Sequence, residues 1–534
     1  MTKNALAMLG DILRSENIGD EDFQRTIGQN AYDQFQLENR VPALFALNNL
    51  IDNKSILYRF FMLCEKFDKE NLLKLFGDKI FCYLLENDFV EICDDNIVKP
   101  NVSLACYDLK LENSVEVVYV FSDVKRINNN VNLVDDYVMS IGGASKSLAK
   151  AIIKNPNFRH YFVGAKSESK VCGENFKDRP IAADIGCGCG VQALILAKLG
   201  YETYATDISD RALLYAKVNS QVNNVKINFL KGSFLDPLEK IGLKFDLIIS
   251  NPPFVITPSE LREEHNYVYR DGGMEGDYLL EYFMANLPKF LKEKGVAIFL
   301  GNFENTDNFW VEKLDKYLPD NSDVWILKRQ DLNCEQYIKM WMDDSLNYFS
   351  CPEEYEKNYA IWLRDFMFRK VISVSFAYFI LQKNSDAVSK KWVKVEDASS
   401  YLHQPDGESI LKTLVNKENV KKCSDDLSLL FAEKYVMPSD VTQERHYIPG
   451  VEDPRLIYMV QGGNLGRKKE ITSLQAGFLG ACDGTLTAKQ ICDALTCILN
   501  SQNGEFEKID YDSVASEMEF FIKESIIEGF LDFT

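Results

Sequence analysis

The chain has 534 residues, of which 46% are hydrophobic and 26% charged. At about 150 residues per domain, this length predicts three to four globular units and excludes a single ordinary core. Sixty lysines and arginines against 80 aspartates and glutamates give a formal net charge of −20. A surface so acidic lacks the broad positive field that drives sequence-independent binding to phosphates, which argues against duplex DNA as a partner.

The cysteines and the apolar segments indicate a cytoplasmic protein. Thirteen cysteines, an odd number, are spread through apolar runs, as in proteins that keep reduced thiols. Residues 1–21 contain no basic segment ahead of an apolar stretch, so no secretory signal is expected. The apolar stretch 371–381 is far shorter than the roughly 20 residues that span a bilayer. We therefore expect no membrane association.

The first hundred residues predict a helical domain that ends in a two-stranded wing. Apolar residues recur first at helical spacing and then as in short strands. The expected helices are 55–65, 70–76 and 78–87, and the expected wing strands are 89–92 and 101–107. We therefore expect a winged-helix-like domain over residues 1–110. Its stretch 70–91 carries two lysines against five acidic residues, which favours a structural or protein-binding role over DNA binding.

Beyond residue 180, short apolar strands alternate with helices, which indicates parallel strands in a doubly wound sheet. The expected strands are 181–185, 201–206, 226–230, 245–250, 296–300, 324–328 and 372–381. The expected helices between them are 191–199, 210–222, 277–291 and 307–317. This pattern predicts an α/β domain over residues 111–385 with a seven-stranded Rossmann-like sheet. The aromatic segment 355–368 has the spacing of a core helix rather than of a base-stacking platform.

The last part of the chain predicts a small accessory domain over residues 386–534. Strong periodicity is missing up to Ile471, where loop-like pieces rich in glycine dominate. Helical spacing then returns at 474–481, 487–499 and 511–528. We expect this carboxyl-terminal unit to be helical or winged-helix-like.

The loop after the first strand of the sheet has the features of a ligand site. The run from Ile181 to Gly190 places a carboxylate, Asp184, ahead of glycines at 186, 188 and 190. Glycine is required where the backbone turns tightly and approaches a ligand. The Gly-x-Gly-x-Gly spacing differs from the Gly-x-Gly-x-x-Gly of dinucleotide sites, and a carboxylate here can accept hydrogen bonds from an amino-acid ammonium.

No metal centre is expected in this loop. Cys187 and Cys189 form a Cys-x-Cys pair. Zinc needs three or four ligands, and no further His or Cys pair follows at metal-ligand spacing. Both cysteines are interpreted as small loop residues.

A second carboxylate ends the next strand. Asp207 follows Thr206 at the position that accepts both ribose hydroxyls in nucleotide-binding α/β folds. The alternative is that Asp207 caps the helix that begins near Ser209. An ammonium site together with a ribose site fits S-adenosylmethionine better than NAD.

The loop after the fourth strand carries the most specific pattern, Asn251-Pro252-Pro253-Phe254. Prolines fix φ and remove donors, so the loop is stiff and its carbonyls are free to accept. The side-chain oxygen of Asn251 and the carbonyl of Pro252 can accept both hydrogens of a planar NH2 group and aim its lone pair at an electrophilic methyl group. Phe254 supplies a flat face for an amide or a base.

These residues resemble the class I S-adenosylmethionine-dependent methyltransferases that modify amino nitrogens, in order and in spacing. The segment from Asp271 to Gly276, with Gly272 and Gly273, resembles the Gly-Gly-x-x-Gly of HemK-type glutamine methyltransferases, which methylate release factors. The motifs cover residues 183–301, less than a quarter of the chain. Outside them, residues 440–446, 452–454 and 481–484 resemble a poorly characterised three-part actinobacterial branch, which implies an architecture and no substrate.

The resemblance implies S-adenosylmethionine as cofactor and no metal. The implied cofactor contacts are Asp184, Gly186, Cys187, Gly188, Gly190, Asp207, Ile208, Ser233, Phe234 and Asn251. The implied catalytic residues are Asn251, Pro252, Pro253 and Phe254. Ser233 stands where relatives often carry the acid that accepts the adenine amino group, so the backbone or Asp236 is expected to replace it. Phe254 stands where glutamine methyltransferases commonly have tyrosine, and phenylalanine is common among enzymes that methylate RNA and DNA amino groups.

We therefore expect an N-methyltransferase whose acceptor is a protein or peptide, with a glutamine side chain as the specific hypothesis. The acidic charge is the physical reason for ranking protein first. An amino group on a nucleic-acid base, in RNA rather than in duplex DNA, is the leading alternative. A binding protein with a vestigial methyltransferase core is a further alternative, against which the intact Asn251 loop argues. The sequence does not indicate the oligomeric state.

Overall fold

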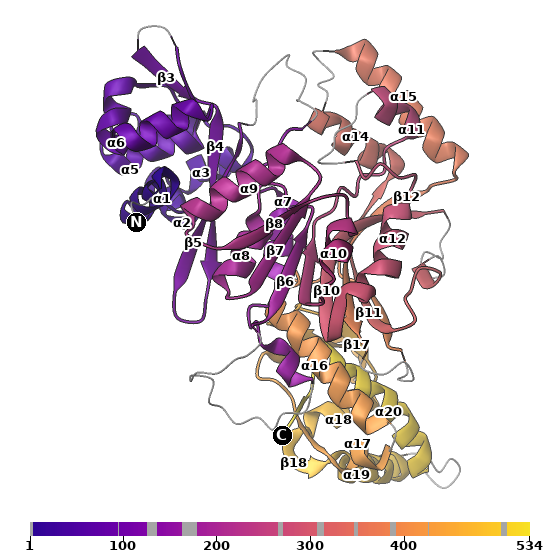
Figure 1. The fold of residues 1–534 in the computed structure, drawn as a ribbon. Coiled ribbons are helices and arrows are strands. Elements are labelled where there is room, and N and C mark those ends of the chain that lie inside the picture. The colour runs from indigo at the N-terminus through magenta and orange to yellow at the C-terminus, as the bar shows by residue number, and fades with distance from the viewer. Residues whose placement is uncertain are drawn as a thin grey trace. The chain divides into compact units, whose positions relative to one another are not determined.

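The computed structural model describes ten ranges of the chain (Figure 1). The chain forms two compact units. The described residues are 4–93, 96–124, 136–162, 179–264, 271–306, 314–345, 351–384, 391–424, 427–502 and 510–534. The first unit comprises Met1–Ala149 and Lys170–Asp397, and the second comprises Lys150–Ser169 and Ala398–Thr534. In the described ranges, no helix combines the length and the apolar character that a membrane span needs.

The first unit begins with a helical region. Its helices are α1 (Ala5–Ser15), α2 (Asp20–Ile27), α3 (Gln29–Gln36), α4 (Val41–Leu47), α5 (Asn53–Leu57), η1 (Tyr58–Met62) and α6 (Lys69–Glu86). A three-stranded sheet joins β1 (Phe67–Asp68), β3 (Ile97–Pro100) and β2 (Val90–Ile92) in that order. The predicted pairing of 89–92 with 101–107 is wrong, because β2 pairs with β3, whereas β4 (Val102–Lys110) forms a hairpin with β5 (Val115–Asp123). The winged-helix assignment stays a prediction.

Two buried asparagines attach the hairpin to the large sheet domain. Asn219 and Asn223 lie on α9 (Asp210–Val222) and just after it. The side chain of Asn223 accepts from the Tyr119 N–H at 3.0 Å and donates to the Tyr119 carbonyl at 2.7 Å. Asn219 makes the same two bonds with Phe121, at 2.8 and 2.9 Å. Each amide thus satisfies backbone groups of β5 as a neighbouring strand would.

The large sheet has eight strands in the order β13-β11-β12-β10-β9-β6-β7-β8. The strands are β6 (Ile181–Ile185), β7 (Glu202–Asp207), β8 (Ile227–Lys231), β9 (Phe245–Ser250), β10 (Leu291–Asn305), β11 (Ser322–Asn333), β12 (Ser373–Lys383) and β13 (Val393–Asp397). The α/β fold and all seven predicted strands are confirmed. Two features differ from the prediction: β12 runs antiparallel to both of its neighbours, and β13 adds an eighth strand parallel to β11. The sheet is therefore mixed. The sequence did not predict the edge strand β13, because it is short and more than half of its residues are polar.

Helices between the strands cover the sheet and build its main core. They are α8 (Val191–Lys198), α9, α10 (Asp236–Ile241) and α12 (Tyr278–Asn286). Phe283, Phe299 and Phe379 stack in sequence, with ring centroids 5.6 and 5.1 Å apart. The predicted helix 307–317 falls mostly outside the described residues.

A helical insertion between β11 and β12 forms a second core beside the sheet. It contains α14 (Cys334–Ser345) and α15 (Pro352–Phe368), which pack with α11 (Ser259–Glu264). Trp362 and Phe366 are 1% and 0% exposed and belong to the core, whereas Tyr355 and Tyr359 are half-buried at its edge. Figure 1 shows the three helices grouped at one end of the sheet domain. This cluster also contains Val255 and Ile256, the residues that follow the Asn251 loop.

The second unit contains both helices and small sheets. Its helices are α16 (Gly407–Ser424), α17 (Leu427–Ala432), α18 (Ser473–Gly480), α19 (Ala488–Gln502) and α20 (Tyr511–Glu528). One sheet orders β15 (Val441–Tyr447), β16 (Pro454–Gln461) and β17 (Lys468–Ile471), and another orders β18 (Asp483–Thr487), β14 (Lys434–Val436) and β19 (Asp532–Phe533). The three predicted helices are present. The stretch before Ile471, which the sequence suggested to be irregular, forms α16, α17 and four strands.

Candidate active site

The register of the sheet brings the predicted loops together. Ile185, the last residue of β6, lies opposite Thr206 of β7 and Ser250 of β9 in parallel strands. The Ser250 hydroxyl donates to the Ile185 carbonyl at 2.8 Å, which ties the two strand ends. The loops that begin after these residues line one cavity of about 360 Å³. This volume lies within the usual range for small-molecule sites.

Most of the predicted site residues line this cavity. They are Gly186, Cys187, Gly188, Asp207, Ile208, Ser233, Phe234, Asn251, Pro252 and Pro253. Asp184 and Gly190 are not among the lining residues, and Phe254 lines a second, smaller cavity. The cavity lining also includes the segment 136–140 and the pair Gly272 and Gly273.

The three glycines of the first loop adopt conformations that other residues avoid. Their φ angles are +69° at Gly186, +52° at Gly188 and +87° at Gly190, all in the left-handed region. A Cβ at Gly190 would lie 3.0 Å from the Ala216 Cβ, whereas a Cβ at Gly186 or Gly188 would meet nothing within 4 Å. Gly190 therefore permits close packing of α8 on α9. Gly186 and Gly188 leave the backbone without side chains where it lines the cavity, so a ligand can approach it closely.

Asp184 is buried behind this loop. The side chain is 1% exposed, and its Oδ2 accepts a hydrogen bond of 3.0 Å from the Ala193 N–H. Burial raises the pKa of Asp184 to about 7, because one backbone donor compensates little of the lost hydration. The nearby Asp207 carboxylate raises this pKa further.

Stability is expected to decrease as the pH rises from about 4 to about 7 because of Asp184. The pKa of this carboxyl group is raised in the folded protein, so its contribution to stability is complete below the unfolded-state pKa of about 3.9 and is lost as the group ionises. Asp184→Asn keeps an acceptor for Ala193 without the charge. Chemical denaturation should show the variant gaining stability over the unchanged protein between pH 5 and about pH 8. A constant difference across this range would contradict the assignment.

Asp207 holds the two neighbouring loops. Its Oδ2 accepts from the Gly188 N–H at 2.8 Å, and its Oδ1 accepts from the Ser209 N–H at 2.9 Å. The alternative that Asp207 caps α9 is wrong, because Ser209 is the N-cap and accepts from the Ala212 N–H. Burial raises the pKa of Asp207 as well. A carboxylate has about four acceptor positions, so Asp207, which lines the cavity, can also accept from ligand hydroxyls.

The loop after β8 forms another side of the cavity. Gly232 donates its N–H to the Asp207 carbonyl at 3.0 Å, which places Ser233 and Phe234 at the cavity wall. Phe234 is held by Phe283, with ring centroids 6.0 Å apart in an edge arrangement. Asp236 begins α10 and is not among the lining residues. Ser233 lines the cavity, and the expectation that Asp236 or the backbone accepts from the adenine amino group stays a prediction.

Asn251 presents a buried acceptor without a partner. Within the described residues, its Oδ1 is buried and has no hydrogen bond. Leaving a buried polar atom unpaired costs about 1–3 kcal/mol, so such an atom needs an explanation. Asn251 lines the cavity with Pro252 and Pro253. A ligand N–H group that enters the cavity would satisfy this oxygen.

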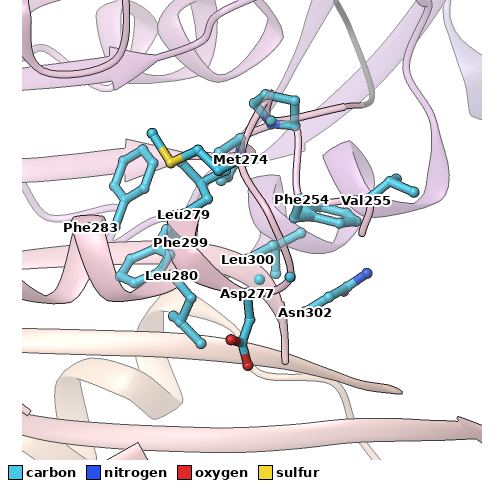
Figure 2. A pocket seen from close by; sticks show the side chains of 15 residues that line it. Phe254, Val255, Met274, Asp277, Leu279, Leu280, Phe283, Phe299, Leu300 and Asn302 are labelled. Atoms are coloured by element: carbon cyan, nitrogen blue, oxygen red, sulfur yellow. The ribbon is translucent and has the colours of Figure 1, made fainter. Parts of the chain in front are cut away.

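Phe254, in the same loop, belongs to the smaller cavity that Figure 2 shows. It lines a small cavity with Val255, Met274 and Asn302, and Figure 2 shows Asn302 extending from β10 toward the Val255 side. The Trp341 ring packs edge-on against Phe254, with centroids 6.5 Å apart. Phe254 thus connects the loop to the helical insertion.

The segment after residue 270 packs directly on the Asn251 loop. Asp271 forms a parallel bridge with Val255, and its Oδ1 accepts from the Thr257 hydroxyl. A Cβ at Gly272 would lie 2.7 Å from the Pro253 carbonyl oxygen and 2.9 Å from Leu279. Glycine is therefore required at 272 for this close approach. The structure thus brings together the two motifs that carry the resemblance to glutamine methyltransferases.

The segment 136–140 is a part of the site that the sequence reasoning missed. Val138 donates its N–H to Asp123 Oδ2 at 2.8 Å. Asp123, at the end of β5, also accepts from the Tyr215 hydroxyl at 2.6 Å and pairs with Arg211, both on α9. No local pattern could reveal this arrangement, because Asp123 and Arg211 are 88 residues apart. In the described ranges, no group of three His, Cys, Asp or Glu side chains could hold a metal ion.

Comparison with known proteins shows what the domain that carries this site is similar to. Residues 167–264 match the family model of the methyltransferase small domain. Over this part of the sheet domain, the chain is similar to methyltransferases. This match confirms the methyltransferase core predicted from the glycine loop and Asp207, although it ends before the Asp271 segment and the helical insertion.

Relatives of this methyltransferase domain include named protein methyltransferases. A putative protein N5-glutamine methyltransferase of Methanocaldococcus jannaschii is 33% identical over 24% of this chain and 66% of its own length. Release factor glutamine methyltransferases of Bacillus cereus and Bacillus subtilis are 28% and 33% identical, over 28% and 22% of this chain and 55% and 43% of theirs. The match therefore covers less than two thirds of each relative, and most of this chain lies outside it.

Solved structures also show similarity to this chain. A putative class I S-adenosylmethionine-dependent methyltransferase of Listeria monocytogenes covers 77% of this chain and 96% of its own, at 14% identity and a TM-score of 0.28. A ribosomal protein L11 methylase of Lactobacillus delbrueckii covers 39% and 72%, at 18% identity and a TM-score of 0.21. Similarity at this level does not bear on the substrate.

Proposed function

We propose that this protein is an S-adenosylmethionine-dependent N-methyltransferase that methylates a glutamine side chain in a polypeptide. The observation that carries the proposal is the unpaired, buried Oδ1 of Asn251, a residue that lines the large cavity. Three features support it further: the bare glycine loop, the Asp207 carboxylate, and the names of the relatives. The first two fit the cofactor, and the names favour an amide acceptor.

The residues of the large cavity fit S-adenosylmethionine. Asp207 would accept from the ribose hydroxyls in addition to the backbone N–H groups of Gly188 and Ser209. Gly186 and Gly188 would let the methionine part approach the backbone, and Ser233 and Phe234 would contact the adenine. When bound, the cofactor supplies an electrophilic methyl group.

The chain itself would orient the acceptor nitrogen. Asn251 Oδ1 and the Pro252 carbonyl would each accept one N–H of the planar amide, which fixes its plane and turns its lone pair toward the cofactor side. As the nitrogen gains positive charge, these two oxygens stabilise it electrostatically, and after transfer the nitrogen loses one proton to solvent water. Asn251 cannot act as a strong base, so this arrangement uses positioning and charge stabilisation. Phe254 lines the smaller cavity and packs against Trp341, so its contact with the acceptor stays a prediction from the sequence.

A labelling experiment tests the proposed acceptor. The protein is incubated with radioactive S-adenosylmethionine and an extract of the source cells, which is then separated into protein and nucleic acid. We expect label in protein, and specifically in N5-methylglutamine after proteolytic digestion. Label concentrated in RNA would establish the alternative acceptor, a base amino group, which Phe254 also suits. No label in any fraction, together with no binding of the cofactor, would contradict the proposal and favour a binding protein with a vestigial core.

A further inference from the structure

The end of the Asn251 loop is attached to a side chain of the helical insertion. Tyr337, on α14, is 0% exposed, and its hydroxyl oxygen accepts from the Ile256 N–H at 2.9 Å. The same oxygen accepts from Asn302 Nδ2 at 3.1 Å. Ile256 is five residues beyond Asn251, and Asn302 lies near the end of β10. One hydroxyl group thus joins the loop, a sheet strand and the insertion.

From this geometry we infer that Tyr337 is a positioning residue for methyl transfer, with Asn302 as its partner. The inference rests on the proposed function, in which Asn251 and Pro252 orient the acceptor amide. Tyr337 lies at the back of the loop and is not a lining residue of the large cavity. It acts on the acceptor through the loop, and it belongs to a part of the chain beyond the residues 167–264 that match the methyltransferase small domain.

The loop needs an anchor at each end. Before it, strand pairing and the Ser250–Ile185 hydrogen bond fix the backbone. Between the ends, Pro252 and Pro253 restrict their own φ and the ψ of the residue before each, but the backbone from ψ of Pro253 onward is not restricted in this way, so the direction of the loop depends on where it is tied afterwards. Ile256 is 2% exposed, so its N–H must find a protein acceptor, and the Tyr337 hydroxyl provides it. Without the Tyr337 hydroxyl, the backbone at Ile256 would tend to shift so that its N–H reaches another hydrogen-bond acceptor.

A second contact from α14 fixes the middle of the loop. Trp341 is one helical turn after Tyr337, so both side chains lie on one face of the helix. Trp341 packs against Phe254, and Tyr337 packs against Trp341 with centroids 6.2 Å apart. Tyr337 also contacts Trp362, Phe366 and Phe376 of the insertion core. These rings hold Tyr337 in place, so its hydroxyl is a rigid reference point for the loop.

Asn302 depends on the same hydroxyl. It is 3% exposed, and within the described residues its Oδ1 has no hydrogen bond, so the bond of its Nδ2 to Tyr337 orients the amide. Asn302 and Pro252 to Val255 line the same small cavity. The Tyr337–Asn302 bond therefore links the loop to the strand that runs beside β9.

Tyr337→Phe tests the inference, because it removes the hydroxyl and keeps the ring. A displacement of the acceptor by about 1 Å costs roughly 100-fold in rate, so we expect kcat for label transfer to fall by about this factor. The dissociation constant of S-adenosylmethionine should change less than about twofold, since the glycine loop and Asp207 are untouched. Hydrogen exchange of the Ile256 amide should become faster. A structural role alone would lower the melting temperature without reducing kcat well below that temperature.

Tyr359→Phe is the matched control. Tyr359 lies on α15 in the same insertion, and its hydroxyl donates to the Glu335 carbonyl at 3.3 Å, away from the loop. This variant should keep the unchanged kcat. Asn302→Leu, which removes one of the two bonds to Tyr337 and leaves the Ile256 bond, should lower kcat less than Tyr337→Phe does.

Several outcomes would overturn the inference. One is an unchanged kcat in Tyr337→Phe. Another is a loss of kcat in Tyr359→Phe as large as the loss in Tyr337→Phe. If Tyr337→Phe does not fold, an unchanged kcat in Asn302→Leu would have the same meaning. If the unchanged protein transfers no label to any acceptor, the proposed function fails separately. Hydrogen exchange then decides on Tyr337, because an unchanged Ile256 amide in Tyr337→Phe would overturn its role in holding the loop.

Discussion

Asn251→Ala is expected to lower the rate of methyl transfer by about 100- to 1,000-fold, the usual cost of removing one preorganised group that stabilises transition-state charge. The physical reason is that Asn251 Oδ1 is a buried acceptor whose partner would be the acceptor N–H. Binding of S-adenosylmethionine should be nearly unchanged, because Asp207 and the glycine loop remain. Label transfer under single-turnover conditions and calorimetric titration with the cofactor measure the two quantities.

Asn228→Ala serves as the control for this variant. Asn228 is partly buried in β8, and its Nδ2 donates to the Thr203 carbonyl at 3.3 Å, outside the cavity lining. Its replacement should leave the transfer rate intact. A wild-type rate for Asn251→Ala would remove the Asn-Pro-Pro-Phe loop from the mechanism. A loss of cofactor binding that accounts for the whole effect would instead make Asn251 a cofactor residue.

Asp207→Asn is expected to weaken S-adenosylmethionine binding by about 100-fold. Hydrogen bonds to charged groups contribute about 1.5–3 kcal/mol each, and an amide cannot accept through both of its ends. The NH2 group of the new side chain would face either the Gly188 N–H or the Ser209 N–H. Both of these groups donate to Asp207, so one of the two hydrogen bonds would be lost. Isothermal titration of the purified variant with the cofactor measures the change.

The exposed Asp210→Asn is the matched control for Asp207. Asp210 is three residues further on, has a side chain 79% exposed and pairs with Lys231 at the surface. Its replacement removes the same charge without touching the cavity, so affinity should stay within about twofold. Equal losses in both variants would point to net charge rather than to the ribose contact. Unchanged affinity in Asp207→Asn would remove Asp207 from the cofactor site.

The loops that line the large cavity could be predicted because their signals are local. Glycines at 186, 188 and 190 have left-handed φ angles that only glycine tolerates well, so the conformation is encoded residue by residue. Asp207 follows directly from the end of a strand. Parallel strands bring their carboxyl ends to one edge, so the prediction of strands also predicted that these loops meet.

Other parts of the first unit carried no such signal. The edge strand β13 is five residues long and was not recognised, and the antiparallel direction of β12 depends on how the chain returns after the insertion. The wing pairing was wrong because two candidate strands, β3 and β4, follow β2 closely, and either could have been its partner. Short strands specify their partners weakly until the surrounding core selects one.

By itself, the sequence determined the α/β class, the order of the motifs and the chemistry that each motif can perform, because backbone conformation and side-chain type act locally. Only the tertiary structure decided which distant groups support those motifs. The Ile256–Tyr337 hydrogen bond spans 81 residues, and the Asp123–Arg211 pair spans 88. Such contacts depend on how helices and strands pack. A tyrosine that holds a catalytic loop and one that fills a core look alike until their neighbours are in place.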